Sequence, residues 1–302
     1  MLIAQRILIV SHLKPDGDAV GASLALKLGL QAINKPVEVS LLDRPPDAFS
    51  FLPHFFSIKG EFAPQDFDLV ILMDCGDWSR TGFFTDSELR IDWPPNLVVI
   101  DHHRIQRLTP GIHIVDATAS SAAELVFYIL EQWEIEITKD IATCLLTGIS
   151  TDTGSFKHTN TSRAVLQVAG ALMEKGASLG KIGRYVYADK SLPRLKLWGK
   201  VLQKMRRHRR WNILVAMITA ENIKECGAEE TDLEGAVDLM RTVPNVRAVL
   251  LGSERGGEYK FNLRTEDAEV DVSRLAALFG GGGHVKAAGF SVSKGDVETI
   301  KN

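Results

Sequence analysis

Near its start the chain reads ILIVSHLKPDGDAVGASLALKLGLQ, residues 7–31. The residues Ile7–Val10 are apolar and mostly β-branched, and they predict the centre of a buried strand over residues 6–11. A polar loop follows, and from Gly21 to Gln31 the apolar residues recur at helical spacing. A strand, a loop and a helix in this order are the opening unit of an α/β fold with a mostly parallel sheet.

The same alternation continues outward from this stretch. Strands are predicted over 37–42, 68–73 and 97–100, and helices over 120–131, 139–149 and 162–175. Two of these strands are continuous apolar runs, which is typical of parallel strands that are covered on both faces. Ser121 and Glu124 have the spacing of a capping box at the start of a helix. We therefore expect an N-terminal, mostly parallel sheet flanked by helices.

From about residue 191 the pattern changes, and we expect a second, smaller α/β domain. Its predicted elements are an amphipathic helix over 195–205, a strand over 213–218, a helix over 233–242, a hairpin of 246–252 and 259–264 across Gly256-Gly257, a helix over 272–279 and a last strand over 289–292. The basic stretch from Lys204 to Arg210 fits a solvated helix end as well as a substrate-facing patch. The expected division is a catalytic domain over 1–185, a helical linker over 186–205 and a substrate-binding domain over 206–302. A chain of 302 residues suits two cores better than one.

Composition narrows the class of protein. The chain is 45% hydrophobic and 24% charged, with a net charge of −3. A protein that coats long nucleic acid is usually basic, so short or small anionic substrates are expected instead. Cys75, Cys144 and Cys226 have no C-x-x-C spacing, which argues against a disulfide framework or a zinc-thiolate site. No signal peptide or membrane-spanning run is found, so we expect a cytoplasmic protein.

Acidic and histidine residues follow several of the predicted elements. They come directly after a strand or at the end of a helix: His12, Asp16 and Asp18, then Asp74, then Asp101-His102-His103, and finally Asp152. In open α/β sheets the ligand site lies beyond the carboxyl ends of the strands. The fold prediction therefore places these separated side chains at one edge of one sheet.

Carboxylates mixed with imidazoles are the ligands of a two-metal hydrolytic site. Each cluster has a plainer interpretation by itself, since Asp16-Gly17-Asp18 has the composition of a turn with a helix N-cap and Asp74 that of a turn residue. The ordered set is much harder to explain in this way. Because carboxylates outnumber imidazoles and no thiolate takes part, we expect two Mn²⁺ ions, with Mg²⁺ or Co²⁺ as alternatives.

Three adjacent side chains cannot all face one ion, so the three residues 101–103 are expected to have different roles. One histidine is expected to be a ligand, the other to face the substrate phosphate, and Asp101 to hold an imidazole from behind. In the second domain, Gly280–Gly283 followed by His284 and Lys286 predicts a flexible turn of free backbone N–H groups that suits a phosphate. Arg264, at the end of a predicted strand, is expected to face the same pocket.

These motifs, in this order, resemble those of the DHH phosphoesterase superfamily, which is named for the string read here as Asp101-His102-His103. The stretch from Gly280 to His284, with Ala287-Ala288-Gly289-Phe290, resembles the DHH-associated domain of that superfamily. Ser79-Arg80-Thr81-Gly82 resembles the corresponding stretch of its nanoRNase and pAp phosphatase group.

The resemblance implies a role for each motif residue. One ion would be held by His12, Asp16, Asp74 and Asp152, and the other by Asp18, Asp74, His102 and Asp152. His103 would contact the scissile phosphate, with Asp101 as its catalytic partner. The substrate-side groups would be Arg80, Asn160, Arg264, Gly282, Gly283 and His284.

The implied activity is that of a metal-dependent hydrolase. Its substrates would be short oligoribonucleotides (nanoRNA), cleaved to mononucleotides, and 3′-phosphoadenosine 5′-phosphate (pAp), cleaved to AMP and phosphate. Partners would be short RNA or DNA oligonucleotides, and we expect a homodimer that does not bind membranes. Two alternatives stay open: a phosphodiesterase for cyclic dinucleotides or their linear products, and a non-catalytic nucleotide-binding sensor. The complete ligand set argues against the sensor.

Overall fold

The computed structural model describes residues 1, 3–83, 96–103, 111–188 and 191–293. The chain divides into two compact units, Met1–Asp189 and Lys190–Asn302. Each unit is described by itself.

The first unit is built on a parallel sheet. Within the described residues its strands are β1 (Ile7–Val10), β2 (Val37–Ser40), β3 (Leu69–Met73), β4 (Leu97–Asp101) and β5 (Ile112–Val115), in the spatial order β2-β1-β3-β4-β5. Every neighbouring pair is parallel, and the register places Val10 beside Leu72 and Met73 beside Ile100. The carboxyl ends of β1, β3 and β4 are therefore level. From β1 the chain adds β2 on one side, and it then returns to add β3 on the other side of β1. Ligands bind at the point where the strand order switches in this way.

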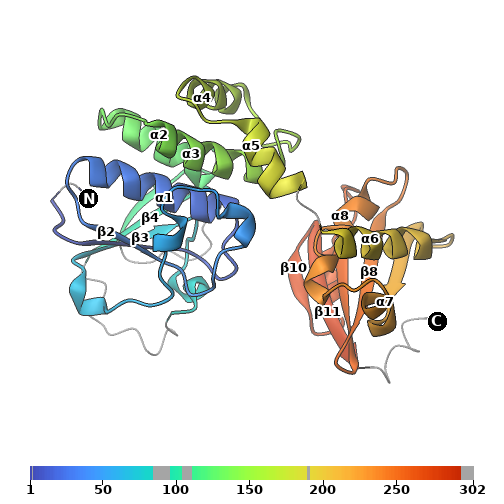
Figure 1. Cartoon of the computed structure of the whole chain (residues 1–302). Coiled ribbons are helices and arrows are strands. Elements are labelled where there is room, and N and C mark those ends of the chain that lie inside the picture. The colour runs from blue at the N-terminus through green and yellow to red at the C-terminus, as the bar shows by residue number, and fades with distance from the viewer. Residues whose placement is uncertain (2, 84–95, 104–110, 189–190, 294–302) are drawn as a thin grey trace. The chain divides into compact units, whose positions relative to one another are not determined.

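Helices cover one face of this sheet. They are α1 (Gly17–Ala32), α2 (Ala122–Gln132) and α3 (Lys139–Asp152), with α4 (Arg163–Glu174) and α5 (Leu179–Gly183) further out (Figure 1). Leu24 of α1 and Leu145 of α3 are fully buried beneath them. The opposite face carries a smaller apolar cluster around Phe67 and Trp78. The expected α/β class with a helix-flanked parallel sheet is confirmed.

Short helical turns complete the first unit. They are η1 (Asp47–Phe49), η2 (Phe55–Ser57), η3 (Pro64–Asp66), η4 (Trp78–Thr81) and the π-helical η5 (Arg184–Ala188). Asp77 precedes η4 and accepts the N–H of Ser79 at 2.9 Å, so it caps this turn.

Two glycines allow α1 and α3 to cross closely. A Cβ atom on Gly21 would lie 2.5 Å from the carbonyl oxygen of Cys144, and one on Gly148 would lie 2.7 Å from Oδ1 of Asp18. Any side chain at these positions would push the helices apart, because such separations are far inside van der Waals contact. The close crossing brings the amino end of α1 next to the carboxyl end of α3, where Asp152 is the last residue.

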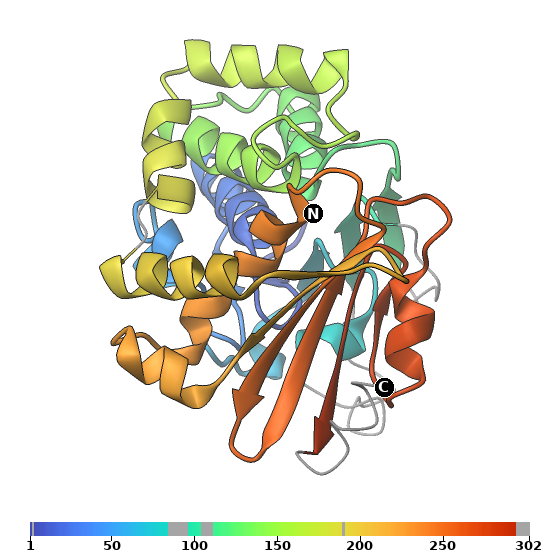
Figure 2. The same ribbon diagram turned by 90° about the vertical axis from the view of Figure 1, so that its right-hand side faces the viewer.

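The second unit contains a mixed sheet. Its described strands are β6 (Arg206–His208), β7 (Ile213–Ile218), β8 (Ala248–Arg255), β9 (Glu258–Arg264), β10 (Gly282–His284) and β11 (Ala287–Ser293), in the order β10-β11-β9-β8-β7-β6 (Figure 2). The pair β7–β8 is parallel and the other neighbours are antiparallel. The hairpin across Gly256-Gly257 is confirmed, and both glycines have positive φ.

Helices pack on both faces of this sheet. The helices α6 (Leu192–Lys204), α7 (Ala220–Glu225) and α8 (Ala236–Arg241), with the turn η6 (Glu230–Leu233), share a core with β7 and β8 that includes Leu197 and Leu251. The helix α9 (Val272–Ala277) packs with Phe261 and Phe290 in another cluster. The residues of β7 alternate between the two clusters, as the pleat of a strand requires.

Several local expectations are wrong. The helix predicted over 233–242 is broken, because Gly235 adopts φ +82° between η6 and α8. The turn predicted at Gly280–Gly283 is partly a strand, since Gly282 and Gly283 pair with β11. The basic stretch is not a helix end, because α6 ends at Lys204 and residues 206–208 form β6.

The capping box predicted at Ser121 and Glu124 is also incomplete. The hydroxyl of Ser121 accepts the N–H of Glu124 at 3.1 Å, as expected. The carboxylate of Glu124, however, accepts the N–H of Ser120 at 2.7 Å, one residue earlier than the motif requires. Within the described residues, none of the helices combines the length and apolarity needed to span a bilayer.

Candidate metal centre

The carboxyl ends of three strands and the ends of two helices meet at one edge of the first sheet. The side chains there lie in the loop after β1, at the start of α1, directly after β3, at and after the end of β4, and at the end of α3. They are His12, Asp16, Asp18, Asp74, Asp101, His102, His103 and Asp152. The strands are held level by the hydroxyl of Ser11, which donates to the carbonyl of Met73 at 2.6 Å. The structure thus brings together residues that lie up to 140 positions apart.

His12 presents one ring nitrogen to the centre. Its Nδ1 lies 2.8 Å from the carbonyl of Leu13, and because a carbonyl only accepts, Nδ1 carries the hydrogen. Nε2 then faces Oδ2 of Asp74 at 3.6 Å. Burial lowers the pKa of His12, but Asp74, Leu13 and Asp16 outweigh this effect and raise it above its ordinary value.

Asp16 and Asp18 were both expected in the loop before the first helix, and the structure places both at the start of that helix. Asp16 is the N-cap of α1, and its Oδ1 accepts the N–H of Asp18 at 3.0 Å and of Ala19 at 3.1 Å. Asp18 lies in the first turn of the helix, because α1 begins at Gly17. The plainer N-cap interpretation of Asp16 is therefore correct, and its carboxylate also lies in one group with His12 and Asp74.

The carboxylate of Asp18 is fully buried against the amino end of α2. Oδ2 accepts the N–H of Ala122 at 2.6 Å and Oδ1 accepts that of Ala123 at 2.9 Å. Burial raises the pKa of Asp18 well above its ordinary value, and the negative charges of Asp74 and Asp152 add to this effect. A cation beside these carboxylates would favour their charged forms and so oppose this shift.

Asp74 occupies the middle of the centre. It is buried, its φ is +52°, and its N–H donates to the carbonyl of Ile100 at 2.8 Å. Its Oδ1 lies 3.5 Å from Nε2 of His102 and 3.4 Å from Nδ1 of His103. Burial raises the pKa of this carboxyl, but the surrounding imidazoles prevail and hold it well below its usual range.

His102 and Asp152 face Asp18 across the centre. Nε2 of His102 lies 3.5 Å from Oδ2 of Asp152 and 3.9 Å from Oδ2 of Asp18. Burial lowers the pKa of His102 while Asp74 and Asp152 raise it, and the result is above its ordinary value. Burial raises the pKa of Asp152 to about 6.

Asp101 holds His103. A single oxygen, Oδ1, accepts the main-chain N–H of His103 at 2.9 Å and lies 2.9 Å from its Nδ1. The hydrogen bond to Asp101, together with the nearby carboxylate of Asp74, raises the pKa of His103 to about 10. His103 is half exposed, whereas His102 is nearly covered. One histidine is therefore turned into the centre and the other is more open to solvent.

The donor set fits divalent cations. The groups His12–Asp16–Asp74 and Asp18–His102–Asp152 each bring three candidate ligand atoms within 4.8 Å of one another, with Asp74 beside both. Among the described residues, Oδ1 of Asp74 and Nε2 of His102 are buried without a hydrogen-bond partner. Buried polar atoms are normally paired, so atoms left in this way indicate a missing ligand. Because Nδ1 of His12 carries the hydrogen, its neutral ring also turns a lone pair toward Asp74.

The expected substrate-side residues of the first unit lie near this centre in different ways. Arg80 is exposed in η4, and its carbonyl accepts the N–H of Leu13, beside His12. The side-chain amide of Asn160 donates to the carbonyls of Ser120 and Asp152, at 3.0 and 3.3 Å. Both amide hydrogens are used inside the protein, which favours a positioning role over the substrate contact expected for Asn160.

The expected substrate-side residues of the second unit gather in one row of its sheet. Arg264 of β9 is opposite Ala287 of β11, and Ala287 is opposite His284 of β10. Arg264 and His284 are therefore two strand spacings apart, about 10 Å. Gly282 and Gly283 belong to the same edge strand. Nε of Arg264 also pairs with Oδ1 of Asp238 at 3.3 Å.

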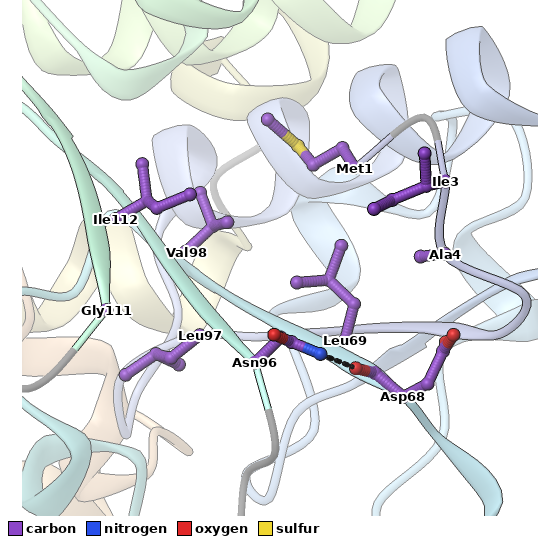
Figure 3. Close-up of a pocket in the computed structure, with 10 residues that line it drawn as sticks. All are labelled: Met1, Ile3, Ala4, Asp68, Leu69, Asn96, Leu97, Val98, Gly111 and Ile112. Atoms are coloured by element: carbon purple, nitrogen blue, oxygen red, sulfur yellow. Dashed lines mark hydrogen bonds between the residues drawn. The ribbon is translucent and has the colours of Figure 1, made fainter.

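A separate pocket lies at the opposite edge of the first sheet. Its volume is about 410 Å³, and it is lined largely by apolar side chains such as Leu69, Val98 and Ile112 around the amide of Asn96 (Figure 3). Asn96 donates to the carbonyl of Asp68 at 3.0 Å. The pocket is at the amino ends of β3, β4 and β5 and includes none of the acidic cluster, so it is not the centre described above.

The sequence did not predict the groups that hold the candidate metal-binding side chains in place. The N–H groups of Ala122 and Ala123 hold Asp18, and Asn160 links Ser120 to Asp152. Main-chain donors have no residue signature, so no pattern could connect residue 18 with residue 122. The serine pair before α2 did mark the start of that helix, which is the part of this arrangement that sequence could supply.

Comparisons with known proteins identify relatives of this chain. A DHH family N-terminal domain matches residues 6–149 and a DHHA1 domain matches residues 212–302. A bifunctional oligoribonuclease and PAP phosphatase, NrnA, from Thermus thermophilus is 33% identical over 97% of this chain and 86% of that protein. The NrnA of Bacillus subtilis is 25% identical over 96% of this chain and 90% of its own length. The crystal structure of an exopolyphosphatase-related protein from Bacteroides fragilis superposes with a TM-score of 0.88, at 30% identity, over 99% of this chain and 92% of that one.

Proposed function

The chain belongs to the DHH family and carries a DHHA1 domain, and on this premise we propose that it hydrolyses short oligoribonucleotides to mononucleotides and pAp to AMP and phosphate. The observation that carries the proposal is the convergence of His12, Asp16, Asp18, Asp74, His102 and Asp152 at one sheet edge. A binding protein would have no need of four carboxylates gathered in this way, because the two that are buried, Asp18 and Asp74, each cost desolvation energy unless a cation compensates it.

Two divalent cations, preferentially Mn²⁺, belong in this centre. His12 and Asp16 would hold one ion, Asp18 and His102 the other, and Asp74 and Asp152 would reach both. When bound, such a pair supplies Lewis-acid activation of a phosphate ester and lowers the pKa of an attacking water. The remaining tasks of orienting the substrate and moving protons belong to side chains of this protein.

His103 is the group best placed to contact the substrate phosphate. Its ring is half exposed while Asp101 and Asp74 hold Nδ1, so Nε2 is the nitrogen available to a ligand. The raised pKa keeps the imidazole protonated and therefore able to donate to a phosphate oxygen as negative charge develops there. Asp101 acts through His103 and is a positioning residue in this scheme.

The second unit would hold the part of the substrate away from the bond that is cleaved. Arg264, Gly282, Gly283 and His284 offer a guanidinium, main-chain groups and an imidazole in neighbouring strands. A guanidinium binds phosphate through two parallel hydrogen bonds, which suits a terminal phosphate or the second phosphate of pAp.

The test is parallel turnover of four substrates by the full chain supplied with Mn²⁺. These are pAp, a ribodinucleotide, a longer single-stranded RNA and a cyclic dinucleotide. We expect release of phosphate from pAp and of mononucleotides from the ribodinucleotide, with slower turnover of the other two. Preferred cleavage of the cyclic dinucleotide would contradict the proposal and favour the phosphodiesterase alternative.

A matched pair of variants identifies the site responsible. Asp152→Asn removes a ligand charge while keeping the shape of the side chain, and it should abolish turnover of both preferred substrates. Asp140→Asn, in the first turn of the same helix, is the control and should turn over at the wild-type rate. Equal activities of the two variants would exclude this centre as the catalytic one.

A further inference from the structure

The basic stretch between α6 and β7 is not used by the proposed function. Five of the seven residues from Lys204 to Arg210 are cationic and none is acidic, although the chain as a whole has a net charge of −3. The stretch forms the edge strand β6 and the turn that follows it, and residues 206–210 are exposed. Lysine and arginine on an edge strand discourage pairing between sheets, so charge alone does not identify a binding site.

A second feature adjoins this edge strand. A pocket of about 390 Å³ opens beside the turn, with a largely apolar lining that includes Trp211, Ile213, Val272 and Leu275. Arg247 also lines it, and its Nε pairs with Asp267 at 3.2 Å. The acidic residue of the lining, Asp271, accepts the N–H groups of Ser273 and Arg274 through Oδ1 and so caps α9. The pocket thus has an aromatic and apolar lining, and Arg209 and Arg210 lie in the turn beside it.

The register of β6 places Arg206 and His208 on the same face of the sheet as Ile213, and the guanidinium of Arg206 donates to the carbonyls of Gln203 and Met205. His208 is opposite Ile213, which lines the pocket, and Arg206 is opposite Val215, two residues further along the same face. Arg207 points to the other face, where it donates to Oδ1 of Asn212 at 2.8 Å and holds the turn. Arg209 and Arg210 form the turn itself, immediately before Trp211.

Trp211 has the exposure of a stacking platform. Its side chain is 57% exposed, and the guanidinium of Arg210 lies over the indole ring, 5.2 Å from the centroid. Surfaces that bind single strands combine aromatic rings, on which bases stack, with cations that follow the phosphates. An acidic peptide would satisfy the cations but would leave the ring and the apolar pocket without a planar partner.

We propose that Arg209, Arg210, Trp211 and the adjoining pocket bind single-stranded RNA, separately from the residues that would hold the scissile phosphate. The identification of the occupant as RNA rests on the proposed function. A base would enter the pocket against the indole, and the flanking phosphates would be contacted by the two arginines. Longer oligoribonucleotides would therefore bind more tightly than dinucleotides.

The experiment measures binding of fluorescent oligouridylate to the full-length chain with a chelator present, so that no turnover takes place. A strand of about twelve nucleotides lies within the site sizes known for single-strand-binding folds. Arg209→Glu/Arg210→Glu should weaken its binding about tenfold or more and lower the logarithmic salt slope by about 1.4, the value for two phosphate contacts. Trp211→Ala should weaken binding about tenfold with little change in slope, and Trp211→Phe should bind with intermediate affinity.

The control carries the same change in charge elsewhere. Arg163→Glu/Lys224→Glu alters exposed residues of α4 and α7 and should bind the strand as the wild type does. Equal affinities of the control and the Arg209/Arg210 variant would overturn the proposal. So would displacement of the strand by polyglutamate at equal charge concentration, because the surface would then recognise charge without bases.

A separate assay keeps this inference apart from the proposed function. Hydrolysis of a ribodinucleotide with Mn²⁺ by the wild type tests the metal centre and does not depend on this surface. Failure of hydrolysis with normal, Trp211-dependent strand binding would contradict the proposed function and support the RNA surface. Normal hydrolysis with strand binding that is insensitive to Arg209, Arg210 and Trp211 would support the proposed function and contradict the RNA surface.

Discussion

One carboxylate oxygen of Asp101 accepts both the main-chain N–H of His103 and the hydrogen on its Nδ1, each at 2.9 Å. The two contacts fix the ring relative to the backbone that carries it. A residue that orients a ligand or a catalytic imidazole in this way usually contributes to activity without touching the substrate.

Replacing Asp101 therefore tests the positioning of His103. Asp101→Ala should lower kcat by about 10- to 100-fold, while the stability changes much less. The pKa of His103 should fall from about 10 toward its ordinary value, because the hydrogen bond that raises it is lost. An NMR titration of the ring protons measures this directly. Asp101→Asn keeps an acceptor oxygen and should recover part of the lost kcat. Unchanged kcat in the alanine variant would show that His103 needs no such support.

The close crossing of α1 and α3 predicts a strong effect of one methyl group. In Gly148→Ala the new Cβ would lie 2.7 Å from Oδ1 of Asp18 and 2.6 Å from Cβ of Ala123. We expect a loss of about 1–3 kcal/mol in the free energy of unfolding, measured by denaturant titration, because the buried helices must separate.

Gly170→Ala is the matched control for this substitution. Gly170 lies inside α4, and a Cβ there would meet nothing within 4 Å. Alanine should stabilise the helix by up to about 1 kcal/mol, because it loses less backbone entropy than glycine. A Gly148→Ala protein as stable as this control would mean that α1 and α3 do not cross as described.

Metal binding should stabilise the fold, because a cation relieves the repulsion between Asp18, Asp74 and Asp152. At a free Mn²⁺ concentration of 100 Kd, linkage predicts about 2.7 kcal/mol of added stability. The midpoint of thermal unfolding of the metal-free protein should rise accordingly when Mn²⁺ is added. The rise should be much smaller in Asp74→Asn and unchanged in Asp66→Asn, which alters an exposed aspartate of η3. The same shift in both variants would place the stabilising ion elsewhere.

The three cysteines should be inert in the folded protein. All three are free and buried, and burial raises the pKa of Cys75 to about 12 and that of Cys144 further. Because the thiolate is the reactive form, iodoacetamide at neutral pH should label none of them in native protein and all three in denaturant. Mass spectrometry counts the labels. Modification of Cys75 under native conditions would show that the loop after β3 opens.

Much of the first unit could be predicted because its strands are buried on both faces. The apolar runs at β1, β3 and β4 are too short for buried helices, and the polar residues that follow them mark their carboxyl ends. The short edge strand β5 was not predicted. Ile112 is 66% exposed and Val115 is at the surface, so this strand has no apolar run to reveal it.

What could not be predicted depends on local backbone choices and on contacts between distant segments. The position of Asp18 in α1 follows from Asp16 acting as the N-cap, a choice between two aspartates that composition leaves open. The break before α8 depends on Gly235 adopting positive φ, and a glycine inside a helical pattern does not by itself announce this. The pairing of Gly282 and Gly283 depends on β11 reaching back to them. The first outcome is a local choice within one turn, and the last depends on a contact between separate strands.

The left-handed backbone of Asp74 has a consequence for how this fold can change over time. Among residues with a side chain, aspartate and asparagine tolerate that conformation best, and glycine tolerates it freely. Asparagine and glycine can each arise from an aspartate codon by a single base change, and both would preserve the turn while removing the charge at the middle of the cluster. Proteins descended from this one would therefore tend to lose catalytic activity while they keep the fold. Such folded and inactive proteins would be free to acquire other functions.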